Sequence, residues 1–181
     1  MGAAVTVVVH RPATAEQLTQ LFGGRVRATV ADQRAIDQLC IAADVVIGAV
    51  LVPGGSAPKL VSRATIAAMK HGAVLVDVSI DQGGCAETSR PTTHSRPTYV
   101  VDGVVHYCVA NMPGAVPRTS TFALNAATRS LVLALADKGI SRALREDANL
   151  RNGLNVHEGR ITCRAVADAL GLAYMPADSA L

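Results

Sequence analysis

The sequence predicts an α/β protein built on an open, mostly parallel sheet, and three observations lead to this class. Short runs of β-branched residues alternate with helical segments through residues 4–109. Several of these runs are continuously apolar, as in strands that are covered on both faces. Half of the 181 residues are hydrophobic but only 3% are aromatic, a mixture typical of Val-rich strands and Ala/Leu-rich helices rather than of a β-sandwich.

The predicted strands and helices follow one another in β-α-β order. Strand patterns cover residues 4–9, 25–30, 44–50, 73–79 and 104–109. Helical spacing covers residues 14–22, a segment that Asp32 can cap and that buries Ile36, Leu39 and Cys40, and residues 62–69. Parallel strands joined by helices make right-handed crossovers, so we expect a doubly wound, Rossmann-like sheet.

Two long loops rich in Gly, Pro, Ser and Thr follow strands at their carboxyl ends, at residues 81–98 and 111–120. Ligands bind at this edge of open α/β sheets, so the loops are the candidate site. The final third of the chain has a different, helical pattern. Helices are predicted there at residues 117–137, 140–145 and 164–170.

Composition and charge exclude several classes of function. The net charge is +3 and the 17 basic residues are spread along the chain, so nucleic acid is not an expected partner. No run approaches about 18 continuous apolar residues, and the first residues lack a signal-peptide pattern, so we expect a cytoplasmic protein that does not bind membranes. Cys40, Cys85, Cys108 and Cys163 form no CxxC pair. We therefore expect reduced, mostly buried thiols and no metal site.

A complete dinucleotide-binding domain starts with a strand that runs into a GxGxxG loop, and this motif is missing from the sequence. Glycine pairs at 23–24, 54–55 and 83–84 lack its spacing. We therefore expect residues 4–9 to be the second strand, where Val9 replaces the usual ribose-binding carboxylate. Arg11 is either a contact for a 2′-phosphate or a solvated surface arginine. A sheet without its first strand has an apolar open edge, which favours aggregation or association with another chain.

Five sequence blocks occur in the order found in one enzyme family. They are residues 45–54 (VVIGAVLVPG), 57–60 (APKL), 80–85 (IDQGGC), 89–93 (SRPTT) and 108–113 (CVANMP). In these blocks the chain resembles the carboxy-terminal half of NAD-dependent L-alanine dehydrogenase, from about Gly2 to its carboxyl terminus. The proton-translocating transhydrogenase alpha subunit is a more distant relative of similar fold. The resemblance implies a partial NAD(H)-binding Rossmann domain in residues 1–116, with a bridging helix and part of the substrate domain in residues 117–181.

The resemblance also implies which residues surround the NAD cofactor. Val50 and Leu51 would line the adenosine side, Val78, Ser79, Ile80 and Asp81 the nicotinamide and its ribose, Arg90 would neighbour the cofactor, and Val109, Ala110, Asn111 and Met112 would close over the nicotinamide. Asp81 would be the catalytic carboxylate, and its place after a strand, beside two glycines, agrees. Turn capping by Asp81, turn formation by Asn111 and a surface ion pair of Arg90 are the alternatives.

In the family, alanine gives its α-hydrogen as hydride to NAD, and the imine is hydrolysed to pyruvate and ammonium. The resemblance places the substrate-binding arginine, a lysine and a catalytic histidine in an amino-terminal domain that is not in this sequence. We therefore expect negligible activity from this chain alone. Three hypotheses stay open: a truncated alanine dehydrogenase, a non-catalytic binding or assembly module, and one part of a split dehydrogenase or transhydrogenase that needs a partner chain.

Several further features are left open by the sequence. Family enzymes are usually homo-oligomers, and the helix at residues 117–137 is a candidate for an interface or for interdomain packing. The missing GxGxxG loop and the valine at position 9 leave the binding of NAD, or of NADP, in question. His94, His106 and His157 have no partner at an interpretable spacing. We expect partly exposed structural histidines at all three positions.

Overall fold

The structure, a computed structural model, describes residues 2–181 and divides into two compact units. Unit 1 comprises residues 1–49, 58–80 and 84–109, and unit 2 comprises residues 50–57, 81–83 and 110–181. The predicted α/β class with parallel strands is confirmed, and it is unit 1 that contains the parallel strands. The prediction of a domain boundary at residue 116 stays a prediction.

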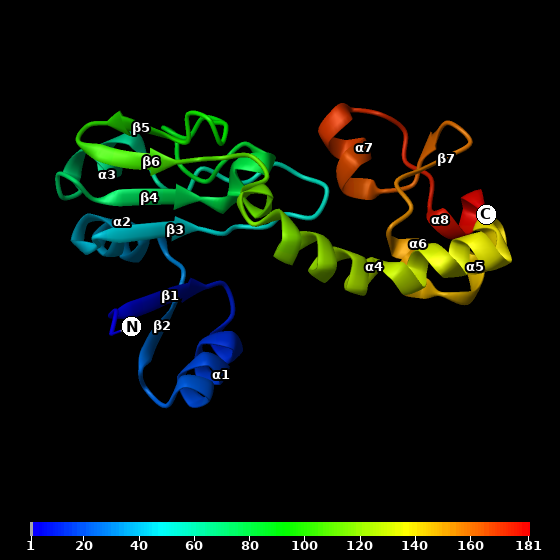
Figure 1. Ribbon diagram of the computed structural model, residues 1–181, viewed down its shortest axis with the longest axis horizontal. Helices are drawn as coiled ribbons and strands as arrows, with labels where there is room; N and C mark the ends of the chain where they lie inside the picture. The colour runs from blue at the N-terminus through cyan, green and yellow to red at the C-terminus, as the bar shows by residue number, and fades with distance from the viewer. Residues whose placement is uncertain (1) are drawn as a thin grey trace. The chain divides into compact units, whose positions relative to one another are not determined.

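Unit 1 contains two sheets. The first pairs β1 (Val5–Val9) with β2 (Val26–Val30) in parallel, and α1 (Pro12–Phe22) connects them. The second has the order β3-β4-β6-β5 (Figure 1). Its strands are β3 (Val45–Gly48), β4 (Val74–Asp77), β5 (Thr98–Val101) and β6 (Val104–Tyr107). Since β3, β4 and β6 run parallel, their carboxyl ends meet at one edge of this sheet.

Two of the helices between the strands start at a side-chain cap. The Asp32 carboxylate accepts a hydrogen bond from the Ala35 N–H at 2.9 Å and begins α2 (Gln33–Ala42), as predicted. Ser62 Oγ accepts from the Thr65 N–H at 3.0 Å and begins α3 (Arg63–Ala68) in the same way. Each cap satisfies an N–H group that the first helical turn leaves without a partner.

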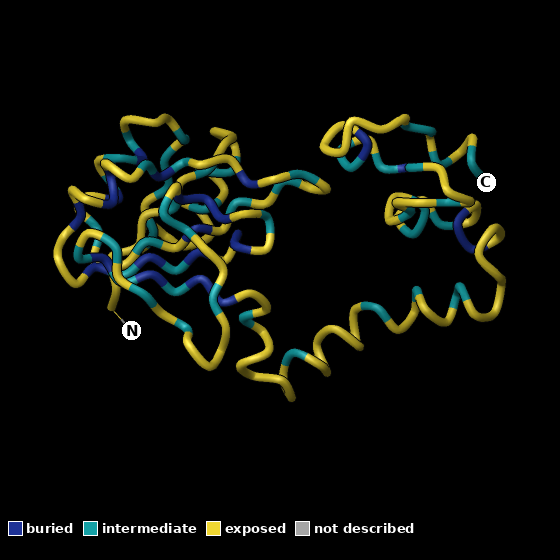
Figure 2. Tube along the Cα trace, turned by 90° about the horizontal axis from the view of Figure 1, so that it is seen from above, coloured by how far each residue is buried: buried dark blue, intermediate teal, exposed yellow. Residues whose placement is uncertain are grey.

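The hydrophobic core of unit 1 lies between α2, α3 and the four-stranded sheet. Its buried members are Ile36, Cys40, Val61, Ile66, Met69, Ala73, Leu75, Ala86 and Val104. Figure 2 shows buried residues concentrated in this part of the chain, whereas exposed residues predominate along α4 (Pro117–Lys138), in which no residue is buried. Burial of Ile66 and Leu75, both 0% exposed, contributes roughly 2–3 kcal/mol for each side chain.

One strand, β5, directly follows the predicted loop over residues 81–98 and was not predicted. β5 pairs antiparallel with β6, and only Asp102 and Gly103 separate them, with φ of 49° and 82°. Two successive positive φ angles are those of a type I′ hairpin turn, for which Asp-Gly is a preferred sequence. The loop predicted over residues 81–98 ends where β5 begins, at Thr98, and β5 itself was not predicted although Asp102-Gly103 is a hairpin signal.

The strand predicted at residues 73–79 also ends early. β4 stops at Asp77, and Val78–Gln82 forms a 3₁₀ helix, η1. The apolar pattern VLVDVSI continues past the end of the strand because Ser79 and Ile80 are buried in the helical turn as well. The turn therefore starts directly at the carboxyl end of β4.

Both β1 and β3 are edge strands. β1 pairs with β2 and β3 pairs with β4, and among the described residues no strand joins the two sheets. In a doubly wound sheet the strand order 3-2-1-4 would place one strand between them. Val45 and Ile47 of β3 are 54% and 66% exposed, so this edge presents apolar side chains to solvent.

Unit 2 is mostly helical. It starts, after the segments that it takes from residues 50–57 and 81–83, with the 3₁₀ helix η2 (Met112–Ala115). Its other elements are α4, α5 (Ile140–Glu146), α6 (Ala148–Asn152), β7 (Val156–His157), β8 (Arg160–Ile161), α7 (Arg164–Leu170) and α8 (Ala177–Ala180). The three predicted helices are confirmed, while α6, α8 and the β7-β8 hairpin were not predicted. Across residues 2–181, no helix combines the length and apolar character needed to cross a membrane.

Candidate functional site

The residues predicted to surround a cofactor follow the carboxyl ends of β3, β4 and β6. Unit 1 contains Val78, Ser79, Ile80, Arg90 and Val109, and unit 2 contains Val50, Leu51, Asp81, Ala110, Asn111 and Met112. In unit 1, the side chains of Ser79, Ile80 and Val109 are buried, whereas Val78 and Arg90 are exposed. If Ser79, Ile80 and Val109 contact a ligand, they would therefore do so through backbone atoms.

A buried carboxylate occupies the end of β4. Asp77 is 0% exposed, and its Oδ1 accepts a hydrogen bond from the Ser79 N–H at 3.0 Å. Its Oδ2 accepts from the Cys85 N–H at 2.8 Å and from the Ser89 hydroxyl at 2.5 Å. These bonds link η1 to the return segment at residues 84–90. Asp77 was not predicted to be a site residue, because in the sequence it is one polar residue within an apolar strand pattern.

Arg90 is held at the end of a ring stack. Its guanidinium carbon lies 4.0 Å from the centroid of the Tyr99 ring, and its backbone N–H donates to Tyr99 Oη at 2.8 Å. The Tyr99 hydroxyl in turn donates to the Thr88 carbonyl at 2.9 Å. On its other side Tyr99 stacks on His106, with ring centroids 5.0 Å apart. Tyr99 belongs to β5, so the unpredicted hairpin is what orients Arg90.

His106 is a buried neutral histidine, which corrects the prediction of partial exposure at this position. It is 0% exposed; Nδ1 lies 3.0 Å from the Val104 carbonyl and Nε2 lies 2.7 Å from Thr88 Oγ1. The carbonyl can only accept, so Nδ1 carries the proton and Nε2 accepts from the Thr88 hydroxyl. Burial lowers the pKa of His106, and Arg90 acts in the same direction, while Val104, Asp77 and Asp102 oppose the shift.

We expect this histidine to make the stability of the chain fall under mildly acidic conditions. The unfolded state takes up a proton near pH 6.5, whereas the lowered pKa of folded His106 keeps the ring neutral, so the free energy of unfolding decreases as pH drops through that value. Urea unfolding between pH 7.5 and 5 measures the effect. His106→Gln is expected to flatten the profile, and His10→Gln, at an exposed position, is expected to leave it unchanged. If the free energy of unfolding depended on pH equally in the two variants, His106 would not be the source of the pH dependence.

The thiol of Cys85, beside the site, is unreactive. Cys85 is 2% exposed, and burial, followed by the neighbouring Asp77 carboxylate, raises its pKa to about 12. A thiol with such a pKa stays protonated near neutral pH and is a poor nucleophile. All four cysteines are free, and within residues 2–181 no group of three or more His, Cys, Asp and Glu side chains could hold a metal ion.

In unit 2, Gln82 fixes the segment that contains Val50 and Leu51. Its side-chain oxygen accepts from the Val52 N–H at 3.0 Å, and its amide nitrogen donates to the Val52 carbonyl at 2.7 Å. The Gln82 carbonyl also accepts from the Ala57 N–H at 2.9 Å. These bonds order residues 52–57, and Leu51 stays 76% exposed beside them. The contribution of Gln82 was not predicted, because the partner of its side chain, Val52, lies 30 residues earlier in the chain.

Two polar side chains of unit 2 are exposed at the predicted positions. Asp81 lies in η1 with its side chain exposed, and Gly83, φ 93°, follows this helix. Asn111 is exposed and adopts a left-handed backbone, φ 58°, immediately before η2. Asn is among the few residues that tolerate this conformation, so the turn-forming interpretation of Asn111 describes its backbone correctly.

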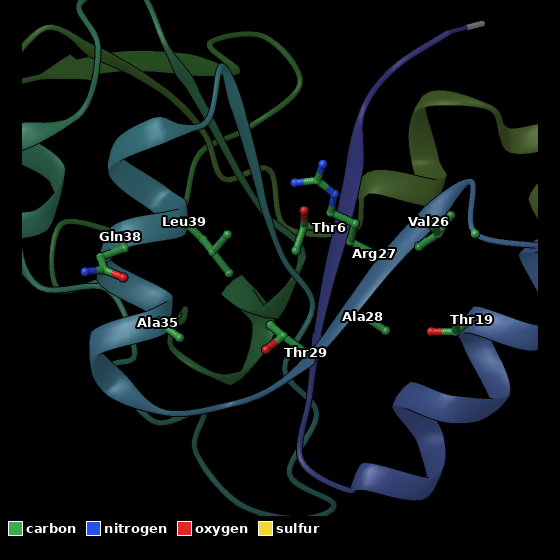
Figure 3. A pocket seen from close by; sticks show the side chains of 10 residues that line it. Thr6, Thr19, Val26, Arg27, Ala28, Thr29, Ala35, Gln38 and Leu39 are labelled. Atoms are coloured by element: carbon green, nitrogen blue, oxygen red, sulfur yellow. The ribbon is translucent and has the colours of Figure 1, made fainter.

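A separate pocket of about 620 Å³ lies between α2 and the β1-β2 pair (Figure 3). Its lining includes Thr6, Arg27, Thr29, Ala35, Gln38 and Leu39. None of the predicted cofactor residues is among the residues that line it, and its polar groups are mainly threonine hydroxyls and Arg27. We therefore assign the candidate site to the strand ends and not to this pocket.

Parallel strands with polar turns at their carboxyl ends define a Rossmann-like domain of the nucleotide-binding class. Residues 1–164 match the family model described as alanine dehydrogenase/PNT, C-terminal domain, and the chain belongs to this family.

Similar proteins agree with this membership. The chain is 56% identical over 179 residues to an alanine dehydrogenase of Halomonas elongata, covering 99% of this chain and 48% of the relative, and 52% identical over 177 residues to that of Mycolicibacterium smegmatis, covering 98% and 48%. A solved L-alanine dehydrogenase has a TM-score of 0.81 at 46% identity, with 94% and 47% covered. A transhydrogenase from Sinorhizobium meliloti has a TM-score of 0.62 at 25% identity, with 91% and 43% covered. The chain thus spans about half the length of the curated relatives that it matches.

Proposed function

We propose that this chain is the cofactor-binding half of an NAD-dependent alanine dehydrogenase, which oxidises L-alanine to pyruvate and ammonium. The observation that carries the proposal is η1 at the end of β4, which presents Asp81 as an exposed carboxylate, in a chain that matches the alanine dehydrogenase family over residues 1–164. Bound NAD would supply the hydride acceptor. The residues of this chain bind, orient and neutralise charge around it.

Exposed side chains that follow the strand ends are each of a kind that could bind a part of such a cofactor. The Asp81 carboxylate can accept from ribose hydroxyls or hold a proton beside the reacting carbon, and the exposed Asn111 can hydrogen-bond the carboxamide. The Arg90 guanidinium, kept in place by Tyr99, offers positive charge to a phosphate. The adenosine side fits less well, since the Val9 side chain at the end of β1 has no group that could accept a hydrogen bond from a ribose hydroxyl.

Alanine oxidation, as proposed, needs a further polypeptide segment that supplies the strand missing between β1 and β3. The edge of β3 is open and apolar, and Val5 and Val8 of β1, the edge strand of the other sheet, are 43% and 38% exposed. A parallel strand between β1 and β3 would cover these side chains and pair both edges. A chain that carries this strand is therefore a better partner than a second copy of this one. This observation favours an enzyme completed by a further segment, as in the truncated-enzyme and split-enzyme hypotheses, over an isolated binding module.

Titration with NADH and NADPH, followed by calorimetry and by protein-detected NMR, tests the cofactor proposal. We expect saturable binding that Asp81→Ala or Asn111→Ala weakens about tenfold or more, because each variant removes a hydrogen bond to the ligand. Asp44→Ala is the matched control, since Asp44 is exposed and precedes the other end of β3. A folded sample that binds neither nucleotide at millimolar concentration would refute binding by the chain alone.

A further inference from the structure

Asp77 is a fully buried carboxylate that the proposed chemistry does not use. Burying a carboxylate is costly unless hydrogen bonds replace its lost water. Three bonds do so here, from the Ser79 N–H, the Cys85 N–H and the Ser89 hydroxyl. All three donors belong to the two segments that follow β4, namely η1 and residues 84–90. Asp77 is therefore the point at which both segments are tied to the sheet.

The backbone around Asp77 is shaped to admit the carboxylate. Gly48 is its register partner on β3, and a Cβ at Gly48 would lie 3.2 Å from Asp77 Oδ1. A Cβ at Gly84 would lie 2.8 Å from Oδ2, and the φ of 80° at Gly84 also favours glycine. Both glycines thus leave room for the oxygens. An amide could not replace the carboxylate fully, because its NH₂ group would face one of the donors.

We propose that Asp77 is a positioning residue for the cofactor-binding turn. Its carboxylate fixes the backbone of η1 and of the return segment, and through them the places of Asp81 and Arg90, while its own side chain stays out of reach of any ligand. The identity of the ligand rests on the proposed function. The hydrogen-bond network does not, so the two can be tested separately.

The test compares Asp77→Asn with Ile66→Val in the full chain. Ile66 is 0% exposed in the core, so Ile66→Val lowers the stability without touching the network. Amide chemical shifts and hydrogen exchange are measured in folded samples, and NADH affinity is measured in parallel. For Asp77→Asn we expect upfield shifts of the Ser79 and Cys85 amide protons, faster exchange through residues 78–90, and a Kd for NADH that rises roughly tenfold or more. For Ile66→Val we expect none of these changes.

Each outcome of the comparison decides the proposal. If Asp77→Asn leaves the Ser79 and Cys85 amides and the exchange of residues 78–90 as in the parent chain, Asp77 does not position the turn. If these signals change while the Kd stays constant, Asp77 is structural only and the proposal is overturned. If the parent chain binds no NADH, the proposed function fails for the chain alone, and the amide signals of Asp81 and Arg90 still decide whether Asp77 holds the turn. Ser89→Ala, which removes one donor, is expected to give a smaller effect of the same kind.

Discussion

Mixing this chain with the amino-terminal half of the Halomonas elongata alanine dehydrogenase, the part outside the match, is expected to raise alanine-dependent NADH formation by at least about 10²-fold over either piece alone. One general acid or base contributes about 10² to 10⁴ to an enzymatic rate, and the substrate anchors come with the same half. The two pieces would also complete one sheet, since the added half brings the strand expected between β1 and β3. The measurement is NADH absorbance during titration of one piece with the other.

Two substitutions at opposite edges of the same sheet provide the control. Ile47 on β3 and Val100 on β5 are 66% and 65% exposed, so an aspartate at either position should leave the isolated chain folded. Ile47→Asp is expected to reduce the recovered rate at least about tenfold, because strand pairing would bury its charge. Val100→Asp is expected to have no such effect. Equal losses from both variants, or no recovery by the parent pair, would contradict assembly at the β3 edge.

Gly48→Ala is expected to destabilise the chain by about 3 kcal/mol, the upper end for overpacking a core. An added Cβ would lie 2.2 Å from Cys85 Sγ and 3.2 Å from Asp77 Oδ1, and both side chains are buried. The backbone at Gly48 has no positive φ, so the cost is one of packing and not of conformation. Urea-induced unfolding, monitored by circular dichroism, measures the change in free energy.

The matched control for Gly48→Ala is its combination with Cys85→Ala. Removing the sulfur eliminates the shorter contact and costs about 1 kcal/mol by itself, as for the loss of one buried methylene-sized group. We expect the double variant to lose about 1–2 kcal/mol less free energy of unfolding than the sum of the losses in the two single variants. Strict additivity would show that the strain does not arise at Cys85.

Much of the fold could be predicted because its signals are local. The cap at Asp32, the apolar runs of β3 and β4, and the helical spacing of α4 are each encoded within one segment. The sequence signal for the β5-β6 hairpin, Asp102-Gly103, is equally local, although the hairpin was not predicted. The positions of Asp81 and Asn111 came from the family resemblance, and their roles stay predictions.

The sequence by itself determined the class of sheet, the order of its elements and the family to which the chain belongs. Only the tertiary structure decided which polar groups are buried and what they hold. Asp77 is satisfied by donors up to 12 residues away, Gln82 by Val52, and His106 by Thr88 on another segment. The physical reason is that periodicity records which face of a strand or helix is apolar, whereas the cost of burying a carboxylate or imidazole depends on donors and acceptors that only folding brings together.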